Sequence, residues 1–274
     1  FNNGHGFIRS PKRPGSAAAL AAIILQSSQN DMHGGQSFAY FDRDMAPYVN
    51  DASEEETFQA MEALIYNLNS MHSRAGAQVP FSSLNLGVET DENARKITRN
   101  VLLAYEKGLG HGENPIFPNI IFRVKEGINL NPEDPNYDLF QLALRVAAKR
   151  LNPTFSFMDS TFNSPFGTEV GYMGCRTRVM SNCCGPEETD GRGNLSFTTI
   201  NLPRLAIRAK GDLDQFFKNV DEMVELTIQQ LLHRYKVQAN LRVKDMPFLM
   251  GQKLYLDSDH LKMEDKIETA IKHG

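Results

Sequence analysis

The segment Glu169-Val-Gly-Tyr-Met-Gly-Cys175-Arg-Thr-Arg-Val179 is followed, after a polar stretch, by Gly193-Asn-Leu-Ser-Phe-Thr-Thr-Ile-Asn-Leu-Pro203, and the rest of the chain is expected to be organised around these residues. The pattern predicts a strand, a loop and a second strand, because valine and tyrosine favour extended backbone whereas Gly174 permits a bend or a close approach. Cys175 is therefore expected at a tip rather than within a strand.

Positive charge lies close to this thiol, because Arg176 and Arg178 both follow Cys175 within three residues. Neighbouring cations lower the pKa of a thiol or prepare a pocket for an anion. A single cysteine is nevertheless more often a small buried hydrophobe than a reactive group. The residue types alone favour a buried, unreactive cysteine. The longer sequence segments around Cys175 favour a reactive thiol.

The composition is that of one large domain, or most of one, with a substantial core. The 274 residues carry 29 basic and 33 acidic side chains, a net charge of -4, with the two signs interspersed. This excludes the basic face that a nucleic-acid binder needs. Three cysteines give no disulfide framework and predict a reducing cytoplasm. The longest apolar run, 17–25, is too short to span a membrane.

Helical and extended patterns alternate along the chain. Helices are predicted near 17–25, 54–73, 91–107, 135–151 and 211–235, and strands near 77–86, 116–124 and 154–162. Asp91 is the expected N-cap of the third helix, and Asp134 with Pro135 the expected start of the fourth. The long amphipathic helix at 211–235 is expected in the core. Such alternation predicts an α/β fold with a parallel sheet, either a barrel or a doubly wound sheet.

Standard cofactor motifs are not evident. The glycine pair Gly34-Gly35 is too weak a signal for a phosphate loop. Cys183 and Cys184 lack the paired spacing of structural zinc, so no metal site is predicted and the two residues are expected in a surface turn. The segment Lys125–Pro135 is polar, and by composition it is an ordinary connection between a strand and a helix.

The two opening segments closely resemble active-site segments of the anaerobic (class III) ribonucleoside-triphosphate reductases. Gly4-His-Gly-Phe-Ile-Arg9, Met71-His-Ser-Arg-Ala-Gly-Ala-Gln-Val-Pro-Phe-Ser83 and Asn131-Pro-Glu-Asp-Pro-Asn-Tyr-Asp-Leu-Phe140 extend the resemblance over the whole chain. It implies part of a ten-stranded α/β barrel of the glycyl-radical enzyme and ribonucleotide reductase type, with parallel strands, surrounding helices and a central finger loop at about 169–203. Residues 1–274 would be a partial catalytic barrel domain, without the N-terminal cone domain and the C-terminal glycyl-radical and zinc region.

The same resemblance implies roles for individual residues. Cys175 would be the finger-loop thiol that becomes a thiyl radical and abstracts the ribose 3′ hydrogen, with formate as the reductant. Thr177 would face substrate and formate, and Arg176 would contribute to substrate binding. Asn194 is the expected active-site amide. Asn201 is the competing candidate for that role and is otherwise expected to bind substrate.

Further partners follow from the family. Lys125 and Gly127 would belong to a loop that senses allosteric ATP or a deoxynucleotide and relays which ribonucleoside triphosphate is reduced. The glycyl radical would lie outside this chain, zinc would bind in the missing C-terminal region, and a radical-SAM activating enzyme and a homodimer are expected. The isolated chain would be inactive. Two alternatives stay open: a glycyl-radical enzyme of the formate-lyase type, and a non-catalytic nucleotide-sensing or dimerisation module.

Overall fold

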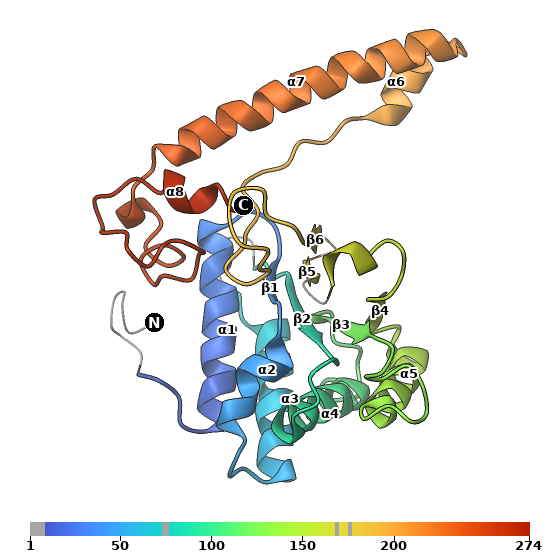
Figure 1. The fold of residues 1–274 in the computed structure, drawn as a ribbon, viewed down its shortest axis with the longest axis vertical. Coiled ribbons are helices and arrows are strands. Elements are labelled where there is room, and N and C mark those ends of the chain that lie inside the picture. Colours follow the sequence, from blue (N-terminus) through green and yellow to red (C-terminus); the bar gives the residue numbers. More distant parts are fainter. Residues whose placement is uncertain (1–8, 73–76, 168–169, 175–176) are drawn as a thin grey trace.

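A four-stranded parallel sheet forms the centre of the molecule in the computed structural model, which describes residues 9–72, 77–167, 170–174 and 177–274 (Figure 1). The strands are β1 (Gln36–Phe38), β2 (Ser82–Leu86), β3 (Asn119–Val124) and β4 (Thr154–Phe157), and they lie side by side in chain order. Helical crossovers connect each strand to the next, as parallel neighbours require. The predicted α/β fold with a parallel sheet is therefore confirmed.

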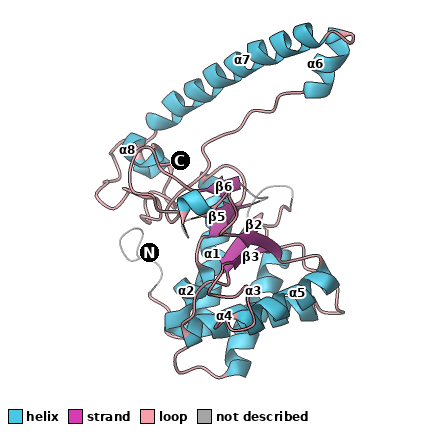
Figure 2. Cartoon of the chain, turned by 45° about the vertical axis from the view of Figure 1, so that its right-hand side comes forward, coloured by secondary structure: helices cyan, strands magenta, loops and turns pink. Residues whose placement is uncertain are grey.

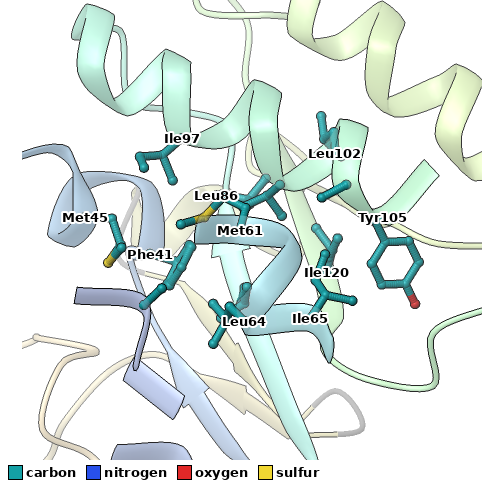
Figure 3. Packing of buried hydrophobic residues seen from close by; sticks show 14 of the residues in the cluster. Phe41, Met45, Met61, Leu64, Ile65, Leu86, Ile97, Leu102, Tyr105 and Ile120 are labelled. Carbon is teal, nitrogen blue, oxygen red and sulfur yellow. The ribbon is translucent and has the colours of Figure 1, made fainter. Parts of the chain in front are cut away.

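Helices cover one face of this sheet (Figure 2). They are α1 (Pro14–Asp31), α2 (Phe41–Met45), α3 (Glu54–Ser70), α4 (Glu92–Lys107) and α5 (Tyr137–Arg150), with short 3-10 turns at Ala46–Tyr48, Ser164–Phe166 and Val243–Asp245. Figure 3 shows the core between them, where Phe41, Met61, Leu86, Ile97 and Ile120 are each 0% exposed. Burial of these apolar side chains is the main stabilising contribution of the fold.

The two faces of the sheet differ in polarity, because successive side chains of a strand point to opposite sides. In β2, Leu84 and Leu86 join the core beneath the helices, whereas Ser83 and Asn85 point to the other face, although all four are buried. That polar face is covered by an antiparallel pair of strands, β5 (Gly171–Met173) and β6 (Thr177–Val179). Strands are thus present on both sides of residues 175 and 176, which lie outside the described part of the chain.

Helix starts follow the predicted caps in one case and depart from them in another. Asp91 caps α4, and its Oδ1 accepts hydrogen bonds from the backbone N–H groups of Asn93 (2.9 Å) and Ala94 (3.3 Å). The prediction that Asp134 caps the fourth helix is wrong, because α5 begins after Asn136. Asp134 instead accepts from the N–H of Asn131 (2.8 Å), which tightens the loop ahead of the helix.

The strand expected at 193–203 is also not as predicted. The structure assigns residues 193–200 to no strand and begins a helix, α6 (Leu202–Ala209), directly after Asn201. The Oδ1 of Asn201 accepts the N–H of Arg204 at 3.0 Å, and Pro203 occupies the first turn. An asparagine followed by a first-turn proline is a helix start, so local capping overrides the β-branched residues before it.

The long helix α7 (Leu213–Ala239) departs most from expectation. It projects from the body together with α6 (Figure 1), and Ala239 is its one buried residue. Phe217 is 61% and Ile228 46% exposed, so the prediction of a core helix is wrong for this chain. The apolar stripe is present, but within the described residues little packs against it. No helix in the described part of the chain is long and apolar enough to cross a membrane.

Residues 241–274 pack beside the end of α7. Val243, Tyr255, Ile267 and Ile271 form a second apolar cluster, and the short helix α8 (Glu268–Ile271) contributes to it. Asp31, at the end of α1, ties this cluster to the main body, since its Oδ2 accepts from the N–H groups of residues 248 (2.9 Å) and 249 (3.0 Å).

Candidate functional site

The hairpin β5–β6 is fixed to the polar face of the sheet by side chains of three strands. The N–H of Tyr172 donates to Asn85 Oδ1 at 2.9 Å, and the carbonyl of Tyr172 accepts from Asn85 Nδ2 at 2.9 Å and from Ser37 Oγ at 2.7 Å. Its phenol oxygen lies 2.9 Å from Ser156 Oγ. Small hydroxyl and amide side chains therefore occupy this face because they satisfy the backbone of a crossing segment.

The hairpin backbone comes closest to the sheet where β5 ends. The N–H of Gly174 donates to Ser83 Oγ at 3.1 Å, and its carbonyl lies 3.4 Å from Asn119 Nδ2. A Cβ on Gly35 would overlap the Cα of Gly174, so the two backbones meet without side chains between them. The sequence does not support the pair Gly34-Gly35 as a phosphate loop. In the structure the pair leaves room for the backbone of the hairpin.

The predicted thiol lies outside the described residues, as does Arg176. The strands on either side are placed: Met173 pairs with Thr177 in the register of β5 and β6, and Thr177 is exposed. Arg178 does not extend toward this end of the hairpin. Its Nη1 donates to Asn163 Oδ1 at 3.0 Å, and its guanidinium lies 3.4 Å from the ring centroid of Phe162.

Of the two candidate amides, Asn194 lies beside the hairpin. Its Nδ2 is 3.5 Å from the sulfur of Met173, and its carbonyl accepts from the N–H of His33 at 3.3 Å. Asn201 is exposed and engaged as the cap of α6. The structure thus brings Asn194, His33 and the end of β5 together and leaves Asn201 apart from them.

A cavity of about 410 Å³ adjoins Asn194, and sequence reasoning missed most of its lining. Asp31, at the end of α1, and His33, just after it, contribute to this lining. Gln238 Oε1 and the Tyr255 hydroxyl, which also line it, are buried without a hydrogen-bond partner among the described residues. Burial strongly raises the pKa of Tyr255, so its hydroxyl stays protonated.

A buried arginine, Arg123, and a buried aspartate, Asp42, lie near the C-terminal ends of β3 and β1. Arg123 is 0% exposed, its guanidinium lies 4.3 Å from the ring centroid of Tyr40, and it donates to the carbonyl of Ala39. Burial raises the pKa of Asp42, while the positive charge of Arg123 and the N–H of Gly87, at 2.7 Å, oppose that rise. An arginine within an otherwise apolar strand is the signal that could have identified this pair.

The predicted effector loop begins where β3 ends. Lys125 Nζ lies 3.4 Å from Asp159 Oδ1, and Gly127 adopts φ +75° with open space around its Cα. The base of the loop is fixed by the buried Asn129, which accepts from the N–H of Lys125 at 2.8 Å. Gly174 contacts the opposite end of β3, at Asn119. A six-residue strand separates the two regions by about 20 Å, so the loop does not adjoin the end of β5.

Comparison with known proteins gives a consistent result. The family model described as anaerobic ribonucleoside-triphosphate reductase matches residues 1–274. Curated relatives of that name include one from enterobacteria phage T4, 32% identical over the whole chain and 50% of its own length. Another, from Haemophilus influenzae, is 30% identical over the whole chain and 42% of its own length. The chain thus spans about half the length of the curated relatives it matches.

Solved structures agree at the level of the fold. An anaerobic ribonucleotide reductase from Thermotoga maritima, with MES in its active site, superposes with a TM-score of 0.60 at 15% identity, over 92% of this chain and 45% of that one. A second structure of it, with dATP in the specificity site, gives 0.57 over 95% and 47%. At this identity, the similarity concerns the arrangement of helices and strands.

Proposed function

Because the chain belongs to the anaerobic ribonucleoside-triphosphate reductase family, we propose that it is the thiol-bearing part of an enzyme that reduces ribonucleoside triphosphates to 2′-deoxyribonucleotides. The observation that supports this proposal is the attachment of hairpin β5–β6 to the sheet. The residues that connect its strands include Cys175, and Asn85 and Ser83 fix the hairpin to the sheet from below. A reaction that removes one particular hydrogen needs its reactive group in one position, and the fixed strands that flank Cys175 support this role.

Each residue of the proposed site has a defined task. Cys175, as a thiyl radical, takes the hydrogen from C3′ of the ribose, after which the 2′ hydroxyl leaves as water with formate as the source of electrons. Thr177 and Arg176 orient substrate and formate. Asn194 directs its amide at the reacting ribose, with Asn201 as the substrate-binding alternative. A glycyl radical outside these residues would supply the unpaired electron when the activated enzyme is assembled.

The remaining architecture is proposed on the same basis. The four parallel strands would belong to a ten-stranded barrel, with 169–203 as its finger loop and the whole chain as a partial barrel domain. The exposed apolar stripe of α7, which includes Phe217 and Ile228, supports packing against further polypeptide. A cone domain, a zinc-binding C-terminal region, a homodimer, a radical-SAM activating enzyme and a cytoplasmic location complete the proposal.

Asn194→Ala in the full-length enzyme is expected to lower kcat on the order of a hundredfold with a small change in KM, because an amide aimed at the reacting centre acts mainly in the transition state. Steady-state kinetics measure both constants. Asn201→Ala is the matched control: it removes a helix cap, which costs about 1 kcal/mol of stability, and should leave kcat nearly unchanged. Loss of kcat in Asn201→Ala but not in Asn194→Ala would exchange the two assignments.

Gly127→Pro tests the proposed effector loop. Proline fixes φ near −65° and cannot adopt the φ of +75° that Gly127 has, so the loop loses its present conformation. We expect effector-dependent substrate choice to be scrambled while basal reduction of at least one nucleotide is retained. Gly211→Pro, at an equally open turn with φ +90°, is the control for strain alone. Unchanged effector dependence in a folded Gly127→Pro enzyme would make this loop an ordinary connection.

A further inference from the structure

Two neighbouring cysteines lie outside everything assigned above. Cys183 and Cys184 are both exposed, in the turn that leaves β6, and their sulfur atoms are 3.6 Å apart. Adjacent residues commonly point their side chains to different sides, so a short sulfur–sulfur distance has to be imposed by the backbone. The two thiols form a single vicinal dithiol open to solvent.

The turn is held in place by residue 182 on one side and by residue 185 on the other. Asn182 Oδ1 accepts the N–H of Cys184 at 3.0 Å, and Asn182 Nδ2 lies 3.0 Å from Nδ1 of the buried His273. His273 Nε2 in turn lies 2.7 Å from Asp257 Oδ2. A Cβ on Gly185 would come within 2.6 Å of the His273 ring. The dithiol therefore stands on a turn packed against the C-terminal residues, which keeps the two sulfurs adjacent.

The surroundings of the dithiol raise the pKa of the Cys184 thiol. Its hydrogen bond to Cys183 is the main cause, and the cations Lys272 and Arg192 only partly oppose the rise. A thiol that shares its proton with its neighbour is well placed to react second, after that neighbour has reacted. Exchange proceeds through a thiolate, and the 3.6 Å between the sulfurs brings the second thiol within reach of the first.

We propose that Cys183 and Cys184 form a reversible oxidation site, which low-molecular-weight disulfides convert to a vicinal disulfide. One thiolate attacks a sulfur of the small disulfide, forms a mixed disulfide and releases one small thiolate. The second protein thiol loses its proton and attacks the mixed disulfide at the protein sulfur, so that the ring closes and a second small thiol leaves. The protein loses two electrons and two protons, and the small disulfide gains them.

The geometry also predicts that this bond is easily reduced. Closing the ring requires the sulfurs to move from 3.6 Å to about 2.05 Å. Adjacent Cα atoms are held about 3.8 Å apart by the peptide unit, below the usual range for disulfides, which strains the product. A strained, exposed disulfide has a more oxidising potential and belongs to the labile kind. Excess thiol should therefore restore the dithiol.

The test uses the full chain with the substitution Cys175→Ser. Cys183 and Cys184 then carry the only thiols of the chain. The protein is incubated with oxidised glutathione, and peptide mass spectrometry follows the segment that contains Cys183 and Cys184. We expect a product lighter by two hydrogen atoms, which excess dithiothreitol returns to the starting mass. In the Cys183→Ser and Cys184→Ser variants we expect a stable glutathione adduct instead, because ring closure is removed.

Phenylarsine oxide provides an independent measurement, because it condenses with two adjacent thiols and releases water. We expect the parent to retain it through gel filtration and each single variant to lose it. Persistence of the glutathione adduct in the parent would overturn the proposal, since the second thiol would then not be placed to close the ring. Failure of this segment to react with either reagent would overturn it as well.

Discussion

Replacing Cys175 by serine in the full-length enzyme is expected to abolish ribonucleotide reduction while the fold and nucleotide binding stay intact. The hydroxyl O–H bond is stronger than the thiol S–H bond, so serine cannot accept the radical and return it in each turnover. Serine has nearly the same volume as cysteine, so the hairpin should keep its hydrogen bonds to Ser83 and Asn85. Deoxynucleotide formation and equilibrium binding of the substrate measure the two properties separately.

Cys183→Ser and Cys184→Ser are the controls for that experiment. Both thiols are exposed and separated from the tip of the hairpin by strand β6, so each variant should retain turnover under reducing conditions. Comparable activity in Cys175→Ser, or an equal loss in the two control variants, would contradict the assignment of Cys175. Because binding is measured alongside turnover, a misfolded variant would be distinguished from an inactive one.

Asn85→Ala is expected to destabilise the 274-residue chain by about 3 kcal/mol in urea unfolding. Asn85 is 0% exposed and bonds both backbone groups of Tyr172, with Nδ2 also 2.9 Å from the carbonyl of Phe38. Alanine leaves the partly buried N–H of Tyr172 without its acceptor, and an unsatisfied buried group costs about 1–3 kcal/mol. In the full-length enzyme the hairpin would lose its position, so kcat should fall together with stability.

Asn93→Ala is the matched control on an exposed surface. Asn93 also donates through Nδ2 to one side-chain oxygen, Asn50 Oδ1, at 2.9 Å, but water can replace that partner. We expect a loss below about 0.5 kcal/mol for this variant. If Asn85→Ala were no more destabilising than Asn93→Ala, the polar face of the sheet would not be what holds the hairpin.

The order of helices and strands could be predicted from the sequence because its signals are local. Asp91 caps α4 through hydrogen bonds two and three residues along the chain. The strand that ends at Leu86 is followed by Gly87, which adopts φ +112°. Patterns of this kind depend on neighbours in sequence, so β2, β3 and β4 and the helices α1, α3, α4 and α5 lie near their predicted positions, whereas the short elements β1 (Gln36–Phe38) and α2 (Phe41–Met45) were not predicted.

Several boundaries could not be predicted because distant residues set them. Asn136 rather than Asp134 precedes α5, since Asn136 is buried and donates to the carbonyls of Gly87 and Glu89, more than 40 residues earlier. The exposure of α7 has a similar origin. Its apolar stripe identifies a face that requires burial, but only the packing of other segments determines whether that face is covered.

For the site, the sequence by itself determined the family, and with it the proposal that Cys175 is the reactive thiol, because the motifs around it are long and contiguous. It favoured Asn194 as the active-site amide and kept Asn201 as the competing candidate, since both lie in the same segment. The tertiary structure placed Asn194 beside Met173 and engaged Asn201 in capping α6. A cap is satisfied within three residues, whereas contact with the hairpin depends on how the chain folds back over the sheet.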